Sequence, residues 1–450
     1  MFKKILIANR GDIALRVLRA CKELGIPTVI VHSTADANSM PVRLADESVC
    51  IGGAPASESY LNIPAILTAA AITGCDALHP GVGFLAENAD FAEMVKAHGL
   101  TFIGPEPHHI RSMGDKVEAK ITAAKGGLPL VPGSPGAVHT LEEAQTLSKD
   151  IGFPLLVKAA SGGGGRGMKV ANTADDLAEA FSAARSEAKA AFGDDTVYLE
   201  RYLDNPRHIE IQVIADAHGN TAHLGERECS VQRRHQKLFE EAPSPVLTDT
   251  QRADIGAVAA KATAEMGYLG VGTMEFLYQD GEFFFIEMNT RIQVEHPITE
   301  EITGIDLVQE QIKVAAGEKL SFSQDDVTFT GHAIECRINA EHPETFMPMP
   351  GKVATFHPSG GTGIRIESPL YAGYSIPPHY DSLIAKLIVY GRDRDHCLAR
   401  LRQALDEFII GPMPTTLDLH KKLVNADAIK DGSYTIKWLE EEFLAKAEGQ

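Results

Sequence analysis

The sequence lacks paired cysteines and long apolar runs. Its six cysteines are scattered without a CxxC pair; they are Cys21, Cys50, Cys75, Cys229, Cys336 and Cys397. This spacing is typical of reduced thiols and unlike that of disulfide frameworks or zinc sites. No apolar run is long enough to cross a membrane, and the first residues lack the pattern of a secretory signal. We therefore expect a cytoplasmic protein that does not bind membranes.

Positive charge is also scarce, because the formal net charge is -19. A nucleic-acid surface needs a basic footprint, so we expect no nucleic-acid partner. A nucleotide site is not excluded, since a few local cations can hold one triphosphate, and the acidity mainly indicates solubility. The chain has 450 residues and a hydrophobic fraction of 44 %, enough for two or three domains with large cores.

The fingerprint of a dinucleotide-binding turn, GxGxxG, is missing from the first turn at residues 9–12. The surrounding pattern nevertheless alternates between strand and helix. A short apolar run at 4–8 precedes a helical pattern at 13–24, with Asp12 as the expected N-cap, and a second strand follows at 28–31. This rhythm predicts a doubly wound parallel sheet, which is a Rossmann-like N-terminal domain.

A stretch rich in Pro and Gly at 125–136 indicates a domain boundary. A small unit is predicted after it, from helices at 141–151 and 174–191 and strands at 155–159 and 197–200. From about residue 205 the pattern favours β-structure. We therefore expect α/β and α+β parts in three domains: 1–115 Rossmann-like, 130–203 a small mobile lid with a glycine-rich loop, and 204–450 a β-rich C-terminal domain.

Four successive glycines stand in the segment 161–167, between two predicted strands. Backbone N–H groups of such a run can close on an anion from angles that a side chain would block, and Lys158 can add a positive charge. The segment is not a Walker A loop, because it lacks the GK[ST] ending. A flexible hairpin tip remains an equal alternative on this pattern alone.

A β-hairpin with two carboxylates is predicted further on, from strands at 272–278 and 282–288. Glu275 and Glu287 stand in these otherwise apolar strands. Two carboxylates on one face beside a triphosphate would bind Mg²⁺. The hypothesis therefore requires that the two side chains share a face.

The loop length decides which face Glu287 occupies. A two-residue turn at 280–281 would pair Glu275 with Ile286 and send Glu287 to the opposite face. A three-residue loop at 279–281 pairs Glu275 with Phe285 and leaves Glu287 on the same face, one diagonal step away. We predict the three-residue loop.

Polar residues alternate with apolar ones past this hairpin, where an extended segment is predicted over 287–295. One edge would carry Glu287, Asn289, Arg291, Gln293 and Glu295. An ordinary half-buried edge strand usually carries Lys, Thr and Ser instead. The mixed-charge row therefore favours a reactive site next to the predicted metal ligands.

At this point the chain resembles a known family, the biotin carboxylases of the ATP-grasp superfamily, over essentially all of its length. The matching runs are 5–11, 79–88, 113–116, 158–168, 229–237, 287–297 and 332–341. The runs at 287–297 and 332–341 are the most specific of these. The resemblance implies an ATP-grasp fold and an ATP-dependent ligase that carboxylates biotin with bicarbonate through carboxyphosphate.

The resemblance also implies residue roles. ATP contacts would come from Lys116, Lys158, Gly164, Gly165, Glu200, Arg201, Tyr202, Leu203, His208, Gln232, His235, Glu275 and Glu287. Mg²⁺ or Mn²⁺ would be held by Glu275, Glu287 and Asn289. Bicarbonate would meet Lys237, Arg291, Gln293 and the backbone of Val294. Glu295 would be the general base and Arg337 the cation facing biotin, so that the catalytic group would comprise Arg291, Glu295, Arg337 and Lys237.

No Met-Lys-Met biotin attachment motif is present in the sequence. Biotin is therefore expected on a separate biotin carboxyl carrier protein, with a carboxyltransferase subunit completing an acetyl-CoA carboxylase of fatty-acid synthesis. A carboxylase for another acyl-CoA or a 2-oxoacid is the alternative, and the family resemblance implies a homodimer. Two other classes stay open from the residues: another ATP-grasp ligase, which should lack the 291–295 array, and a nucleotide-binding regulatory protein, which should lack a lysine or metal ligand.

Overall fold

A computed structural model describes residues 1–159 and 167–445 of the chain. Five parallel strands form its N-terminal sheet, in the order β3-β2-β1-β4-β5. The strands are β1 (Ile5–Ile7), β2 (Thr28–Ser33), β3 (Glu47–Gly52), β4 (Ala77–His79) and β5 (Thr101–Phe102). Residues 5–7 are fully buried, as expected for a strand covered on both faces.

Helices cover this parallel sheet, and two apolar clusters fill the space between them and the strands. The helices of this part are α1 (Gly11–Glu23), α2 (Met40–Leu44), α3 (Ile63–Thr73), α4 (Ala89–Ala97), α5 (Pro107–Gly114) and α6 (Lys116–Lys125), with 3-10 turns η1 (Thr34–Asp36) and η2 (Ala56–Glu58). One local prediction is wrong: the N-cap of α1 is Arg10, and Asp12 lies inside the first turn. Its carboxylate is therefore available to residues outside the helix.

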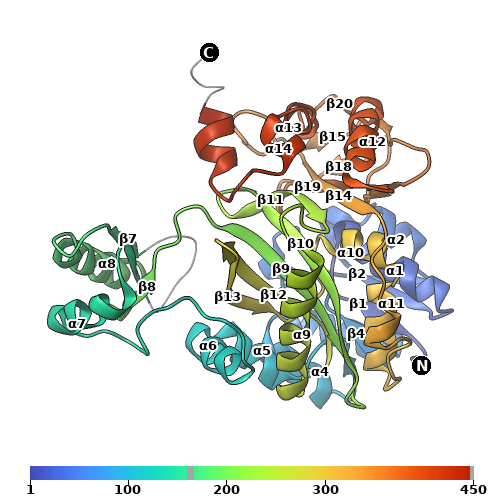
Figure 1. Cartoon of the computed structure of the whole chain (residues 1–450). Coiled ribbons are helices and arrows are strands. Elements are labelled where there is room, and N and C mark those ends of the chain that lie inside the picture. Colours follow the sequence, from blue (N-terminus) through green and yellow to red (C-terminus); the bar gives the residue numbers. More distant parts are fainter. Residues whose placement is uncertain (160–166, 446–450) are drawn as a thin grey trace.

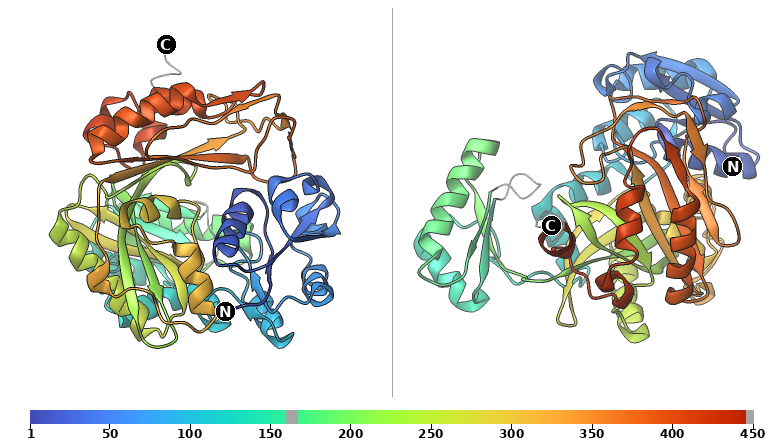
Figure 2. Two further views of the ribbon diagram at one scale, coloured as in Figure 1. Left: turned by 90° about the vertical axis from the view of Figure 1, so that its right-hand side faces the viewer. Right: turned by 90° about the horizontal axis from the view of Figure 1, so that it is seen from above.

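A small separate unit follows and stands apart from the rest of the molecule, to the left in Figure 1 and in the right-hand view of Figure 2. Its antiparallel strands have the order β7-β6-β8. The elements are α7 (Leu141–Ile151), β6 (Leu155–Ala159), β7 (Met168–Ala171), α8 (Leu177–Phe192) and β8 (Val197–Arg201). They enclose an apolar cluster of their own, so the unit has its own core. We call it the lid unit.

An eight-stranded sheet forms the centre of the molecule, in the order β13-β12-β9-β10-β11-β14-β19-β17 (Figure 1). Its strands are β9 (Arg207–Ala215), β10 (Thr221–Arg233), β11 (Gln236–Ala242), β12 (Gly270–Gln279), β13 (Glu282–Asn289), β14 (His332–Asn339), β17 (Ile364–Glu367) and β19 (Leu383–Gly391). Neighbouring strands in this sheet pair in the antiparallel sense. The sheet thus brings distant parts of the chain side by side.

Helices and short strands complete the two ends of this sheet. They are α9 (Asp249–Glu265), α10 (His296–Thr303), α11 (Leu307–Ala315), η3 (Gln324–Asp326), β15 (Gly351–Lys352), β16 (Thr355–His357), β18 (Ser375–Ile376), α12 (Arg394–Glu407), β20 (Ile409–Gly411), α13 (Leu417–Leu423), α14 (Asp427–Asp431) and the π-helix η4 (Trp438–Leu444). The left-hand view of Figure 2 shows the C-terminal elements lying over both the central sheet and the N-terminal part. In the part of the chain that the structure describes, no helix is long and apolar enough to cross a membrane.

Candidate active site

The turn of the β12–β13 hairpin differs from the prediction. Gln279 pairs with Glu282, so the connection consists of Asp280 and Gly281 alone. Both residues have positive φ, 54° and 85°. That conformation defines a type I′ turn, whose twist matches the two strands and which Asp-Gly strongly favours. The predicted three-residue loop is therefore wrong.

A β-bulge in β13 nevertheless places Glu275 and Glu287 on the same face of the hairpin, as predicted. Phe276 pairs with Phe285, and the next pair along is Glu275 with Glu287, so Ile286 is an extra residue in β13. The bulge shifts the register by one residue. Glu275 and Glu287 end up directly opposite each other and hence on one face of the hairpin. This is closer than the predicted diagonal step.

A single ammonium group joins three strands of the sheet and the turn that follows β13. Lys237 Nζ on β11 lies 2.6 Å from Glu210 Oε2, 3.0 Å from Glu275 Oε1 and 2.6 Å from Glu295 Oε1. It also donates to Gln293 Oε1 at 3.3 Å. The Lys237 side chain is only 12 % exposed, so these contacts are shielded from solvent. We call Lys237, Glu210, Glu275, Gln293 and Glu295 the central cluster.

Charge balance keeps Lys237 and Glu275 ionised. Burial alone would lower the pKa of Lys237, but Glu210, Glu275 and Glu295 outweigh burial and raise it well above its usual range. Burial would raise the pKa of Glu275, yet Lys237 and His208 hold it well below its usual range. Opposite charges at hydrogen-bond distance thus dominate desolvation on both sides of the pair.

The segment after β13 turns where the sequence predicted an extended row. β13 ends at Asn289, residues 290–295 form a bend and a turn, and Glu295 is the N-cap residue of α10. Alternation along a strand therefore does not explain why the polar side chains meet. They meet because the turn folds back toward the central sheet: Gln293 and Asn289 each donate to Glu275 Oε1 at 2.9 Å.

Arg291 lies at the outer side of this turn. Its Nη2 donates to Asn289 Oδ1 at 2.9 Å, and its Nε donates to Glu87 Oε2 at 2.8 Å. Glu87 also accepts the backbone N–H of Thr290 at 3.1 Å. The loop that contains Glu87, in the N-terminal part, therefore supports the turn.

Arg337 on β14 binds the other carboxylate oxygen of Glu295, the one that Lys237 does not contact. Its Nη2 donates to Glu295 Oε2 at 2.8 Å, and its Nε donates to Glu240 Oε1 at 2.5 Å. Burial would raise the pKa of Glu295, but Lys237 and Arg337 together lower it far below its usual range. Glu295 is thus an ionised carboxylate held between two cations.

Glu240 and Glu335 form a second layer behind Arg337. They pair directly across β11 and β14, and both are fully buried. Burial raises the pKa of Glu240 to about 7 in spite of Arg337, and it raises the pKa of Glu335 well above its usual range. Two fully buried carboxyl groups that pair across neighbouring strands cannot both ionise without a large cost, so we expect them to retain a proton near neutral pH.

The predicted nucleotide residues divide between the central sheet and the lid unit. Lys158 Nζ lies 3.5 Å from Glu200 Oε2, and Glu200 also pairs with Lys120. Burial would lower the pKa of Lys158, but Glu200 and Tyr198 raise it. These lysines form a basic pair beside one carboxylate at the edge of the lid unit.

Residues 201–203, three more of the predicted ATP contacts, lead from the lid unit toward the central sheet, and we call them the hinge. Arg201 Nη2 lies 3.1 Å from Glu282 Oε2, and the hydroxyl of Tyr202 accepts a hydrogen bond from Lys437 Nζ at 3.0 Å. Leu203 is buried at 8 % exposure. The hinge is therefore held by contacts to β13 and to the end of the chain.

Of the remaining predicted nucleotide-binding residues, some lie near the central cluster and others lie outside the described residues. Gln232 Nε2 lies 3.0 Å from His208 Nδ1 beside the central cluster. His235 is exposed in the turn between β10 and β11, with a φ of 64°. Gly164, Gly165 and the side chain of Lys116 lie outside the described residues.

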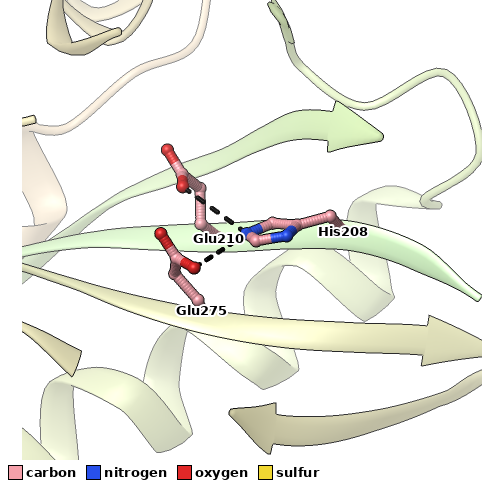
Figure 3. Close-up of side chains that lie close together, drawn as sticks. All are labelled: His208, Glu210 and Glu275. Atoms are coloured by element: carbon pink, nitrogen blue, oxygen red, sulfur yellow. Dashed lines mark ion pairs between the residues drawn. The ribbon is translucent and has the colours of Figure 1, made fainter. Parts of the chain in front are cut away.

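Two groups of side chains in the described residues have the spacing of a metal site: His208 with Glu210 and Glu275, and Glu210 with Cys229 and Glu295. Figure 3 shows the first group, whose side chains point toward one another from two neighbouring strands. His208 Nε2 lies 3.0 Å from Glu275 Oε2 and 4.0 Å from Glu210 Oε2. Mg²⁺ prefers oxygen ligands. The opposed pair of Glu275 and Glu287, with the amide of Asn289 nearby, therefore fits Mg²⁺ better than the histidine group.

Several residues of the site were not singled out from the sequence; they are Glu87, Lys120, Glu210, Arg227, Glu240, Glu335 and Lys386. Glu210 carried a usable signal, because polar residues alternate with isoleucine and valine along β9. Arg227 is fully buried, and its Nε donates to Glu210 Oε1 at 2.5 Å, which fixes the position of that carboxylate. A buried arginine of this kind gives no periodic signal, since its role depends on strand neighbours.

Comparisons with known proteins cover three successive parts of the chain. Family models match residues 1–110 (biotin carboxylase, N-terminal domain), 115–323 (carbamoyl-phosphate synthase L chain, ATP binding domain) and 335–441 (biotin carboxylase C-terminal domain). The chain is 57 % identical to the biotin carboxylases of Pseudomonas aeruginosa and Haemophilus influenzae, in each case over 441 residues that cover 98 % of both chains. Together, the models span nearly the whole chain.

Solved structures agree with the sequence comparisons. A biotin carboxylase–β-γ-ATP complex from Campylobacter jejuni superposes with a TM-score of 0.91 at 48 % identity, covering 98 % of each chain. The biotin carboxylase domain dimer of Hydrogenobacter thermophilus 2-oxoglutarate carboxylase, in complex with MgADP, ADP and bicarbonate, gives 0.90 at 48 % identity with the same coverage. The predicted fold class is thereby confirmed, and the chain belongs to the biotin carboxylase family of ATP-dependent carboxylating ligases.

Proposed function

We propose that this chain uses ATP and bicarbonate to carboxylate biotin and releases ADP and phosphate. The observation that carries the proposal is the position of Glu295, a buried carboxylate between the ammonium of Lys237 and the guanidinium of Arg337. Two cations flanking one base form a place where a small oxyanion can bind beside a proton acceptor. Arg291 and Gln293, with the backbone of Val294, border the same turn and complete the proposed bicarbonate site.

The first step is the activation of bicarbonate. Glu295 takes the proton of bicarbonate while the bicarbonate oxygen attacks the γ-phosphorus of ATP, and ADP leaves. Bicarbonate that binds Lys237 draws this ammonium from Glu295 and so raises the basicity of the carboxylate. The product is carboxyphosphate, which water would hydrolyse, so closure of the lid unit over the nucleotide serves to exclude water.

The second step is the transfer to biotin. Carboxyphosphate breaks into CO₂ and phosphate, the phosphate takes the proton from N1 of biotin, and N1 attacks CO₂. Negative charge develops on the ureido oxygen of biotin when N1 loses its proton, before N1 attacks CO₂. Arg337 is fixed by Glu240 and Glu295, so it can stabilise that charge without reorganising, an effect commonly worth several kcal/mol.

The nucleotide would lie between the lid unit and the central cluster. Lys116 and Lys158 would bind its phosphates, Gly164 and Gly165 would cover them, and residues 200–203 with His208, Gln232 and His235 would surround the nucleoside. The opposed carboxylates Glu275 and Glu287, with Asn289, would hold Mg²⁺ or Mn²⁺. This ion would neutralise phosphate charge and make the γ-phosphorus more electrophilic.

The test is ATP cleavage measured with and without bicarbonate and free biotin. The proposal expects cleavage that depends on bicarbonate and is stimulated by biotin. The variant Glu295→Gln should lose about 10²–10⁴-fold in rate, the usual contribution of a positioned general base. Cleavage that ignores both bicarbonate and biotin would refute the proposal.

The proposed partners follow from the same chemistry. Biotin would arrive on a biotin carboxyl carrier protein, and a carboxyltransferase subunit would pass the carboxyl group to acetyl-CoA, in the cytoplasm. The domain dimer of the Hydrogenobacter thermophilus relative supports a homodimer. The division 1–115, 130–203 and 204–450 matches these roles, with the lid unit in the middle. Transfer of labelled carboxyl from a purified carrier protein to acetyl-CoA or to a 2-oxoacid tests the partners.

A further inference from the structure

Lys386 lies in the middle of β19 and is 1 % exposed. In the sheet it pairs with Arg337 of β14 on one side and with Glu367 of β17 on the other. Directly paired residues share a face of a sheet, so Lys386 and Arg337 point to the same side. Lysine side chains are almost never fully buried unless the ammonium group is paired.

The ammonium of Lys386 has two close contacts. Nζ donates to the backbone oxygen of Val294 at 2.7 Å and lies 3.2 Å from Asp12 Oδ2 of α1. Burial would lower the pKa of Lys386, but Glu335, Asp12 and Glu367 raise it. The group therefore remains a charged donor, which forms stronger hydrogen bonds than a neutral one.

The oxygen that Lys386 binds belongs to the peptide between Val294 and Glu295. This peptide lies in the turn of residues 290–295, which has no strand ladder to hold it. Fixing its carbonyl fixes the plane of the peptide, and with it ψ of Val294 and φ of Glu295, which is -83°. The direction in which the Glu295 side chain leaves the backbone depends on that φ.

We propose that Lys386 is a positioning residue for the bicarbonate site, because its ammonium orients the peptide that joins the Val294 backbone to the base Glu295. The inference rests on the proposed function. The other partner of the ammonium is Asp12 on α1, which is not needed for the hydrogen bond from Lys386 to Val294. Lys386 itself does not touch the reacting atoms.

The experiment compares Lys386→Met with Asp12→Asn as the matched control. Methionine keeps the length of the side chain and removes the donor, whereas Asp12→Asn weakens the ion pair and leaves the bond to Val294. We expect Lys386→Met to raise the KM for bicarbonate at least about 10-fold, a loss of about 1.4 kcal/mol. The KM for ATP should stay within about twofold of the wild type, and the control should change the bicarbonate KM by less than about threefold.

A purely structural role would change both KM values or neither, and either result would overturn the inference. Thermal melting checks that each variant is folded. If the methionine variant does not fold, Lys386→Leu provides a second side chain without a donor, and the same comparison of the KM values for bicarbonate and ATP is made on it. Wild-type protein without bicarbonate-dependent cleavage would refute the proposed function instead, so the two failures are distinguishable.

Discussion

Replacing Lys237 by methionine should reverse the way stability depends on pH. The wild-type ammonium is shared by Glu210, Glu275 and Glu295 within 3.0 Å. Removing one partner of a buried ion pair typically costs about 3–5 kcal/mol, because the remaining charge is left uncompensated. Here three buried carboxylates lose the same cation, so we expect at least that cost at pH 8.

The expected change in melting temperature follows from the chain length. The unfolding entropy is about 2.1 cal/mol/K per residue. If all 450 residues unfold together, each kcal/mol lost from the free energy of unfolding lowers the melting temperature by about 1 °C. Lys237→Met should therefore melt about 3–5 °C below the wild type at pH 8. Activity should also be lost, since the proposed bicarbonate site loses its central cation.

The pH dependence separates this explanation from a simple packing defect. In the wild type the pKa of Glu275 and of Glu295 is lowered, so these groups stabilise the fold above their unfolded pKa, and the stability is lost as the pH falls through their folded values. Without Lys237, burial raises both pKa values. Protonation then relieves the cost, and the variant should approach the wild type as the pH falls from 8 to about 5.5.

Melting curves of both proteins at several pH values measure the effect. Lys430→Met is the matched control, because Lys430 pairs with Asp427 at 3.1 Å on the surface, where the side chain of Lys430 is 46 % exposed and that of Asp427 is 96 % exposed. Such a pair contributes about 0–1 kcal/mol, so the control should melt within about 1 °C of the wild type at every pH. A difference between Lys237→Met and wild type that stays constant between pH 5.5 and 8 would contradict the electrostatic argument.

Three further outcomes are expected. Glu287→Gln should raise the Mg²⁺ concentration for half-maximal ATP cleavage about 10-fold or more, with little change in melting temperature; an unchanged Mg²⁺ dependence would remove Glu287 from the metal site. Gly281→Ala should cost about 1 kcal/mol, measured as a lower melting temperature, because alanine is strained at a φ of 85°. Glu240→Gln should weaken the hold on Arg337 and reduce biotin-stimulated cleavage about 10-fold. Because burial raises the pKa of Glu240 to about 7, the wild type loses stability as the pH rises through that value and the variant does not. The melting temperature of Glu240→Gln relative to wild type should thus increase from pH 5.5 to pH 8, and a flat or opposite trend would refute the assignment.

Local patterns were sufficient for much of the architecture. The helix predicted at 141–151 matches α7 at both ends, and the first strand and helix are displaced by only one or two residues. Apolar periodicity and capping are properties of neighbouring residues, so they are visible in a linear sequence. The motifs at 287–297 and 332–341 also identified the family, which the comparisons confirm.

The hairpin shows where a local pattern is not sufficient. Asp280-Gly281 is a strong signal for a two-residue turn, but in a regular hairpin such a turn places Glu275 and Glu287 on opposite faces. The bulge at Ile286 reconciles the two observations. A bulge depends on how a strand packs against its partners, and sequence alternation does not report it.

The amino-acid sequence by itself determined the order of helices and strands, the parallel N-terminal sheet and the identity of most polar residues in the site. Only the tertiary structure decided which of them meet. Lys237 contacts Glu210, Glu275 and Glu295, and Lys386 reaches Val294 and Asp12, because an eight-stranded sheet places distant segments side by side. The partners of a buried charge come from strands that are far apart in the sequence. A periodic pattern reports only residues that are near one another in the chain, so it does not predict these contacts.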